Sequence, residues 1–224
     1  MPISLFKPKT RRLEPLEVKA ESERIIKALG GGVCDWLPWR ERTKPRQSHE
    51  VADRALVLHA MLQIFFGAPT DVAASWISAN RLEQSLSQYD RLVLAKKRED
   101  LTDQEGMNLF WYVEALWAMM WAGQLIEELP IDRRVGDNLT SFLPNVQANE
   151  DAGSFRRRFA LRPYDEIYRM LDLYYRAHWY AREGQLSGQP TEPFNLDVIM
   201  ERRRALEWIS DRSIDDWEET PEDT

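Results

Sequence analysis

The stretch from Met107 to Ile126, MNLFWYVEALWAMMWAGQLI, constrains the fold of this chain more than any other segment. It contains three tryptophans, one tyrosine and one phenylalanine, and Glu114 is its only charged residue. A segment this apolar must be buried, and a carboxylate inside it needs a partner because an unpaired buried charge is strongly unfavourable. The segment therefore predicts a core helix and an ionic partner for Glu114.

The same segment has the length of a membrane span, which is about 20 apolar residues. Glu114 would then lie near the middle of the bilayer, at a cost of about 3 kcal/mol. Asn108 and Gln124 add further polar groups. We expect a buried helix of a soluble protein and no membrane association.

The composition is that of an ordinary globular protein, with 43% hydrophobic and 30% charged residues. A formal net charge of −7 favours solubility and argues against general nucleic-acid binding. The charge is uneven: residues 1–46 hold eleven Lys and Arg against six acids, whereas residues 211–224 hold seven acids and one arginine. We expect an extended basic arm over 1–16, an all-α domain over 17–210 and an acidic tail over 211–224.

Cys34 is the only cysteine, so no intrachain disulfide can form. Asp35 beside it disfavours the thiolate, and we assign no nucleophilic role to this thiol. The first residues, MPISLFKPKTRR, lack the apolar core of a signal peptide. A cytoplasmic protein is the expectation.

Start and stop signals divide the chain into helices, and no alternating strand pattern occurs. Thr102 and Glu105 have the spacing of a capping box, Pro163 suits the first turn of a late helix, and Asn195 is placed to cap the last one. The fold class is therefore all-α, a single multi-helix globular domain around the aromatic-rich central helix. The expected helices cover 18–29, 48–66, 70–94, the segment between Thr102 and Pro130, short stretches near 137–142 and 151–159, 163–186 and 196–209.

Three charged residues fall on apolar stripes when residues advance by 100° along each helix. They are Glu114 in the central helix, Arg54 in the 48–66 helix and Arg202 in the 196–209 helix. Arginine suits a buried pair because its planar guanidinium grips a carboxylate at two points. We expect a buried bridge from Glu114 to Arg54, to Arg202 or to both.

This bridge has two interpretations. In the one we favour, it fixes the register of the helices; in the other, the arginines line a pocket for a small anion and Glu114 holds them in place. His178 lies on an apolar face, which is more typical of a hydrogen-bonded core histidine than of a catalytic base. Asp172 and Arg176, by contrast, share a face with other charged residues and are expected to be solvated. Arg203 and Arg204 are expected to point away from the apolar stripe of their helix.

The motif search gives no catalytic residue, no metal site and no cofactor. The chain has no His-Glu-x-x-His motif and no Cys/His cluster, and a possible ligand pair, His49 and Asp53, is weak by itself. Gly30–Gly32 lacks the Gly-Lys-Ser/Thr of a phosphate loop and follows a helix, so its expected role is to end that helix.

Four blocks resemble a bacterial family known as domain of unknown function 4272. They are RALVLHAMLQIFFG (54–67), WYVEALWAMMWAGQLIEELP (111–130), LRPYDEIYRMLDLYYRAHWYAREGQLSG (161–188) and VIMERRRALEWI (198–209). The resemblance covers roughly residues 20–224 and is most specific in the second half. It implies a bacterial origin and an α-helical fold, and it brings no catalytic residues.

The leading interpretation is a non-enzymatic interaction or regulatory protein, with a second copy or another protein as its partner. It follows from the absence of catalytic motifs and the abundance of tryptophan, which interfaces favour. Trp36, Trp39 and Trp217 lie in expected loops or tails and are candidate partner contacts; the alternative is that they fold back onto the core.

The second interpretation is a helical enzyme or small-anion-binding protein, with a pocket formed by Glu114, Arg54, Arg202 and His178. A perturbed carboxyl pKa among tryptophans would support it, although structural ion pairs perturb pKa values too. Nucleic-acid binding through the basic arm is the interpretation that the acidic composition favours least.

Overall fold

The computed structural model describes residues 13–136 and 138–223, and within them every regular element is helical. Eight α-helices follow one another without a strand in these ranges, so the all-α prediction is confirmed. The α-helices are α1 (Pro15–Ala28), α2 (Ser48–Phe65), α3 (Thr70–Ala79), α4 (Gln88–Leu94), α5 (Asp103–Ala122), α6 (Gly153–Arg158), α7 (Tyr164–Ser187) and α8 (Leu196–Ser210). Short 3-10 helices are η1 (Glu83–Ser85), η2 (Arg98–Asp100), η3 (Leu139–Phe142) and η4 (Trp217–Glu219).

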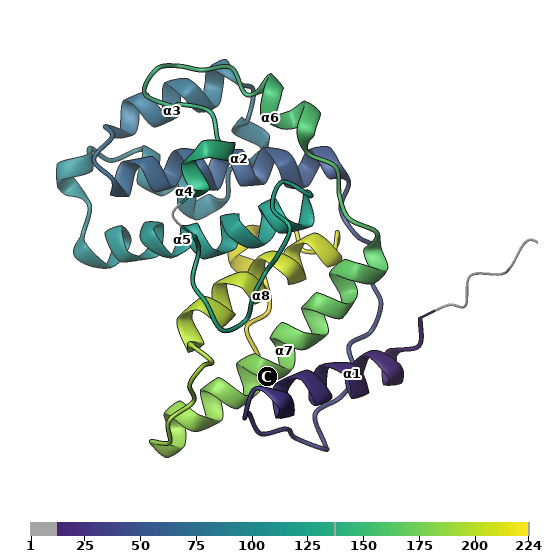
Figure 1. Ribbon diagram of the computed structural model, residues 1–224. Coiled ribbons are helices and arrows are strands. Elements are labelled where there is room, and N and C mark those ends of the chain that lie inside the picture. Colours follow the sequence, from purple (N-terminus) through teal and green to yellow (C-terminus); the bar gives the residue numbers. More distant parts are fainter. Residues whose placement is uncertain (1–12, 137, 224) are drawn as a thin grey trace, which may run out of the picture.

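The main helices pack as a series rather than around one axis. The contacts run from α3 to α2, from α2 to α5, from α5 to α8, from α8 to α7 and from α7 to α1 (Figure 1). Each inner helix therefore has neighbours on two sides, and this explains why α5 is apolar around most of its circumference.

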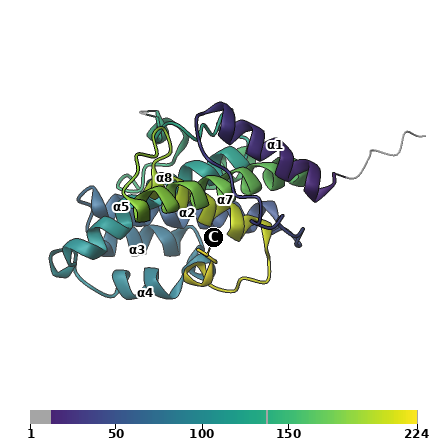
Figure 2. The ribbon, with the colours of Figure 1, turned by 90° about the horizontal axis from the view of Figure 1, so that it is seen from below.

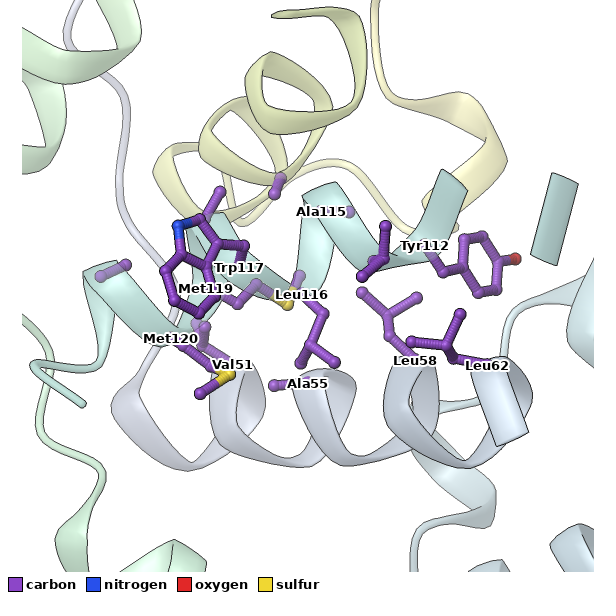
Figure 3. Close-up of a cluster of buried hydrophobic side chains, with 14 of the residues drawn as sticks. Val51, Ala55, Leu58, Leu62, Tyr112, Ala115, Leu116, Trp117, Met119 and Met120 are labelled. Atoms are coloured by element: carbon purple, nitrogen blue, oxygen red, sulfur yellow. The ribbon is translucent and has the colours of Figure 1, made fainter. Parts of the chain in front are cut away.

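The central helix α5 is the aromatic-rich segment singled out above. Thr102 caps it, since its side chain accepts a hydrogen bond from the backbone N–H of Glu105, as the capping-box spacing predicts. One side of α5 lies along α2, where Leu116 and Met120 approach Val51 and Ala55 (Figure 3). Twelve of its twenty residues are buried, so the helix forms the core.

The expected helix over 70–94 is broken into two. Asn80 ends α3, and Arg81 follows with φ +57°, in the left-handed region that non-glycine residues seldom occupy. The backbone N–H of Leu82 then bonds to Ile77 O at 3.0 Å, which turns the chain and places Leu82 in the core. The sequence correctly predicted the first and last residues of this helical region, at 70 and 94, but it did not predict the turn between α3 and α4.

The two terminal segments differ from the expected boundaries. Residues 1–12 of the expected arm lie outside the described residues, and α1 begins at Pro15, so the end of that arm is helical. The expected acidic tail packs against the domain: Trp217 is 2% exposed and Thr220 is also buried. Tryptophan buries a large apolar area, which offsets the cost of ordering the chain around it.

Viewed from below, the C-terminal segment lies beside α4 (Figure 2). The side chain of Asp216 accepts a hydrogen bond from the backbone N–H of Gln88, at the start of α4. Within the described ranges, no helix combines the length and the apolar content that crossing a bilayer demands.

Candidate functional site

Glu114 and Arg202 form a buried ion pair between α5 and α8. Arg202 Nε lies 2.8 Å and Nη2 lies 2.7 Å from the same Glu114 carboxylate oxygen. The other oxygen accepts a hydrogen bond from the backbone N–H of Val135 at 3.2 Å. Glu114 is 1% exposed and Arg202 is fully buried, so the pair is closed to solvent.

The far end of Arg202 is also occupied. Its Nη1 donates to Pro130 O at 2.5 Å and to the hydroxyl of Tyr174 at 3.1 Å. Burial raises the pKa of Tyr174 to about 12, against the opposing effect of the Arg202 charge, and the hydroxyl therefore stays protonated. This network links α5, α7, α8 and the loop after α5, so its role is structural.

Arg54 does not meet Glu114. Its Nη1 pairs with the buried carboxylate of Asp90 on α4 and donates to Ser85 O at 3.1 Å. Tyr112 of α5 donates its hydroxyl to the same Asp90 at 3.1 Å. Tyr112 precedes Glu114 by two residues, so the two side chains leave α5 in directions about 200° apart. Arg54 lies on the side of α5 that carries Tyr112, and for this reason it does not reach Glu114.

Asp90 was not among the expected site residues, although a local signal marks it. Ser87 and Asp90 have the spacing of a capping box, and the structure shows both of its hydrogen bonds at the start of α4. Glu114, Arg54 and Arg202 therefore belong to two separate networks and do not line one pocket.

His178 is buried beside Arg203, with 2.7 Å between His178 Nδ1 and Arg203 Nη1. Burial, and then the Arg203 charge, lower the pKa of His178 to about 4, so the ring is neutral at pH 7. Arg203 also pairs with Glu207 at 3.3 Å. The expectation that Arg203 points away was wrong, because the C-terminal segment covers it and Glu222 O accepts a hydrogen bond from it.

Asp172 and Arg176 are buried as well, contrary to the solvated face expected for them. Arg176 donates through Nε and Nη2 to the two oxygens of Asp172, at 2.9 and 3.0 Å. The same guanidinium donates to Leu37 O and Pro38 O in the loop between α1 and α2. This loop covers the α7 face, which no local pattern in α7 reveals.

The loop over residues 33–47 is held at several points. Lys19 of α1 donates to Asp35 O at 2.9 Å and to Leu37 O at 2.7 Å. Leu37 is buried in a small cluster with Cys34 and Tyr175. Further contacts come from the Tyr168 hydroxyl on Arg40 O, the Thr43 hydroxyl on Ser210 O, and the backbone pairing of Lys44 with Arg212.

Two tryptophans project from this held loop into solvent. Trp36 is 75% exposed and Trp39 is 45% exposed. Trp36 touches Trp179 of α7 edge to face, with 6.4 Å between ring centroids, and the Trp39 indole N–H donates to Glu41 at 3.1 Å. The third candidate contact, Trp217, is buried against Trp208 and Arg54 and is unavailable to a partner.

In the part of the chain that the structure describes, no group of three or more His, Cys, Asp and Glu side chains is arranged to hold a metal ion. Asp53, the weak ligand candidate paired with His49, accepts a hydrogen bond from Arg156 at 2.7 Å. The candidate site is therefore the surface formed by Trp36 and Trp39, which we call the tryptophan loop.

Comparison with protein families matches residues 19–220 to the family described as Domain of unknown function (DUF4272). Neither a curated protein nor a solved structure matches the chain.

Proposed function

The chain belongs to the DUF4272 family, and we propose that it is a non-enzymatic interaction module that binds a second copy of itself through the tryptophan loop. The observation that carries the proposal is the exposure of Trp36 and Trp39 on a loop whose backbone carbonyls accept hydrogen bonds from side chains of α1 and α7. Tryptophans of this kind are the residues that most often dominate binding energy at interfaces.

The fixed backbone matters for the energetics of binding. A loop that must be ordered on association loses conformational entropy, and this cost reduces affinity. Here Lys19 and Arg176 already hold the carbonyls of the residues around Trp36. The buried Asp172–Arg176 pair thus helps to keep the loop rigid. A rigid loop loses little conformational entropy on binding, so a given buried area yields a higher affinity.

A second copy is the proposed partner because two-fold dimers are the commonest assemblies of soluble chains and place identical patches in contact. The proposal locates the protein in a bacterial cytoplasm. The single free cysteine is consistent with a reducing compartment. The bacterial source is part of the proposal and rests on the family resemblance of the sequence.

Sedimentation velocity over a range of concentrations up to high micromolar tests the proposal. We expect wild-type protein to associate and the double variant Trp36→Ala/Trp39→Ala to remain monomeric. The variant should keep its melting temperature, because neither side chain belongs to the buried core.

Leu186→Ala is the matched control, since Leu186 is 73% exposed but lies at the end of α7 outside the loop. It should associate like the wild type. A wild-type protein that stays strictly monomeric at high micromolar concentration contradicts the proposal, as does association that the double variant retains.

A further inference from the structure

Three described residues other than glycine have a backbone in the left-handed region: Arg81, Gln124 and Asn149. This conformation suits glycine and is unfavourable for most other residues, with asparagine among the best tolerated. Each such residue therefore needs a reason to be retained, either in the local structure or in the function of the protein.

Two of the three have a local reason. Asn149 is of a residue type that tolerates the left-handed region. The side-chain amide of Gln124 donates to Ala160 O at 2.9 Å and to Leu161 O at 3.3 Å, so it ties the turn after α5 to the segment before α7. No ligand is needed to account for either residue.

Arg81 has neither reason. It follows α3 where helices most often end with glycine, and its backbone N–H bonds to Ser78 O at 3.0 Å. A cation suits the carboxyl end of a helix, but an earlier position in the last turn would provide it without the left-handed backbone. The Arg81 side chain is exposed and makes no hydrogen bond or ion pair with the residues that the structure describes. A local rule broken without a structural gain is typical of functional sites.

Arg81 lines a surface cleft of about 480 Å³, a volume within the range of small-molecule sites. Three stretches that are far apart in the sequence contribute its wall. They are parts of 46–53 at the start of α2, of 81–85 after α3, and of 208–215 at the end of α8 and beyond it. The cleft therefore exists only in the folded protein.

Two acids in the wall of this cleft are already paired. Arg212 lies 3.3 Å from Glu50, and Arg156 lies 2.7 Å from Asp53. Arg212, Glu50 and Asp53 line the cleft, whereas Arg156 reaches Asp53 from α6. These pairs leave little net charge to attract a ligand.

The second arginine in the wall, Arg46, is engaged as well. It stacks on the Trp208 ring, 3.8 Å from the ring centre. Its two terminal nitrogens donate to the carbonyls of Asp211 and Ile214. Arg46 thus holds the chain after α8 in place and forms part of the fixed wall.

Asp215 is the exception among the acids of the cleft. Its carboxylate is exposed, and within 13–136 and 138–223 it makes no hydrogen bond or ion pair. Its charge attracts Arg46 only at longer range. The described wall thus carries an unpaired guanidinium, that of Arg81, and an unpaired carboxylate, that of Asp215, on different segments.

We propose that this cleft binds a small zwitterion of the amino-acid class, with its carboxylate on Arg81 and its ammonium group on Asp215. A guanidinium can offer two parallel N–H groups to one carboxylate. A simple anion is disfavoured because Asp215 repels it, and a simple cation is disfavoured because Arg81 repels it. The site shares no residue with the tryptophan loop and does not depend on the proposed self-association.

Chemical shifts of ¹⁵N-labelled protein at pH 7 give a direct test. The probes are L-alanine and 4-aminobutanoate, which differ in the distance between their charges. Propionate, butanoate and ethylammonium at equal ionic strength are the references, since each carries a single charge. We expect at least one zwitterion to shift the backbone amide resonances of Arg81 and Asp215 saturably, with an affinity about tenfold or more above that of any reference. The Trp36 indole resonance should not move.

Arg81→Gly tests the carboxylate contact. Glycine is the residue that this backbone position favours, so the variant should fold with an unchanged or higher melting temperature. Its affinity for the zwitterion should fall about tenfold or more, as loss of a charge-assisted contact implies. Gln124→Gly is the matched control, because it changes another left-handed residue that does not line the cleft; it should keep the affinity of the wild type.

Asp215→Asn tests the ammonium contact. It keeps the shape of an exposed side chain and removes the charge, so the variant should fold normally. The preference for the zwitterion should disappear. L-alanine and 4-aminobutanoate should then bind no more tightly than propionate and butanoate.

Three results would overturn the proposal. The first is a set of cleft resonances that neither zwitterion moves. The second is equal affinity of the wild type for a zwitterion and for the acid without its amino group, which removes any role for Asp215. The third is undiminished zwitterion binding by Arg81→Gly, which removes the carboxylate contact.

Discussion

The networks of Arg202 and Arg54 show two ways in which one protein buries an arginine. Both side chains lie in the core, and both pair with a carboxylate from another helix. Arg202 meets its carboxylate through Nε and Nη2 and uses Nη1 for a carbonyl and a hydroxyl. Arg54 uses only Nη1 and leaves the other edge without an acceptor.

The difference teaches that burial of a charge does not by itself identify a functional site. The Arg202 network holds α5, α7 and α8 together and is closed to solvent. The Arg54 network holds α2 to α4 and leaves Nε and Nη2 buried without an acceptor among the described residues. The two networks therefore differ in the contact between guanidinium and carboxylate rather than in depth: Arg202 brings two nitrogens to Glu114, and Arg54 brings one to Asp90.

The largest expected effect comes from breaking the closed network. Arg202→Met leaves Glu114 buried with one backbone donor, Val135 N–H. We expect the free energy of unfolding, measured by urea denaturation, to fall by about 3–5 kcal/mol, as when one partner of a buried ion pair is removed.

The double variant Glu114→Leu/Arg202→Met is the control for this loss. It removes both charges, and replacing a buried pair by apolar residues is often close to neutral. It should therefore recover more than half of the lost stability. A loss below about 1 kcal/mol for Arg202→Met alone would mean that the pair behaves like an exposed salt bridge.

Breaking the Arg54 network should cost less. In Arg54→Met, Asp90 keeps two donors, the Tyr112 hydroxyl at 3.1 Å and the Ser87 backbone N–H at 2.9 Å. We expect a loss of about 2 kcal/mol in the same urea experiment, because the remaining carboxylate stays partly satisfied. An equal or larger loss than for Arg202→Met would remove the distinction between the two networks.

The smallest expected effect is a pH dependence of the free energy of unfolding. It comes from Glu218, which lies near the Arg54 network and not near Arg202. Burial and a hydrogen bond with Asp216 raise the pKa of Glu218 from 4.5 to about 7. Between these values the folded state holds a proton that the unfolded state has lost, so stability falls as pH rises from about 4.5 to about 7. Glu218→Gln, which does not titrate, should lack this component.

Urea denaturation of both proteins at pH 5 and pH 8 measures the difference. The wild type should lose more stability over this interval than Glu218→Gln does. Because the Glu218 side chain is in part exposed to solvent, which screens its interactions, we expect a small change. Parallel behaviour of the two proteins would show that the Glu218 carboxyl has an ordinary pKa.

Much of the fold follows from local patterns. The capping signals at Thr102 and Asn195 placed the starts of α5 and α8, and the apolar run after Thr102 identified the central helix. The break at Arg81 escaped prediction because it depends on a left-handed residue that carries no distinctive local signal. Helical periodicity continues across such a turn whenever both halves bury their apolar sides.

The candidate site was predicted only in part. The sequence placed Trp36 and Trp39 outside the helices, and both are exposed; it made the same prediction for Trp217, which is buried. The supporting pair of Asp172 and Arg176 was missed, since its charged face suggested solvent. That face is buried by a loop more than 130 residues earlier in the chain, at Leu37 and Pro38.

The sequence by itself determined the helical class, the central position of α5 and the need of Glu114 for a partner. These features depend on residues a few positions apart, whose relative directions the helix geometry sets. Only the tertiary structure decided that Arg202 is that partner, that Arg54 turns to Asp90, and that two tryptophans remain exposed. These outcomes depend on distant segments packing together, because a side chain's partner and exposure are set by whatever covers it in the folded chain.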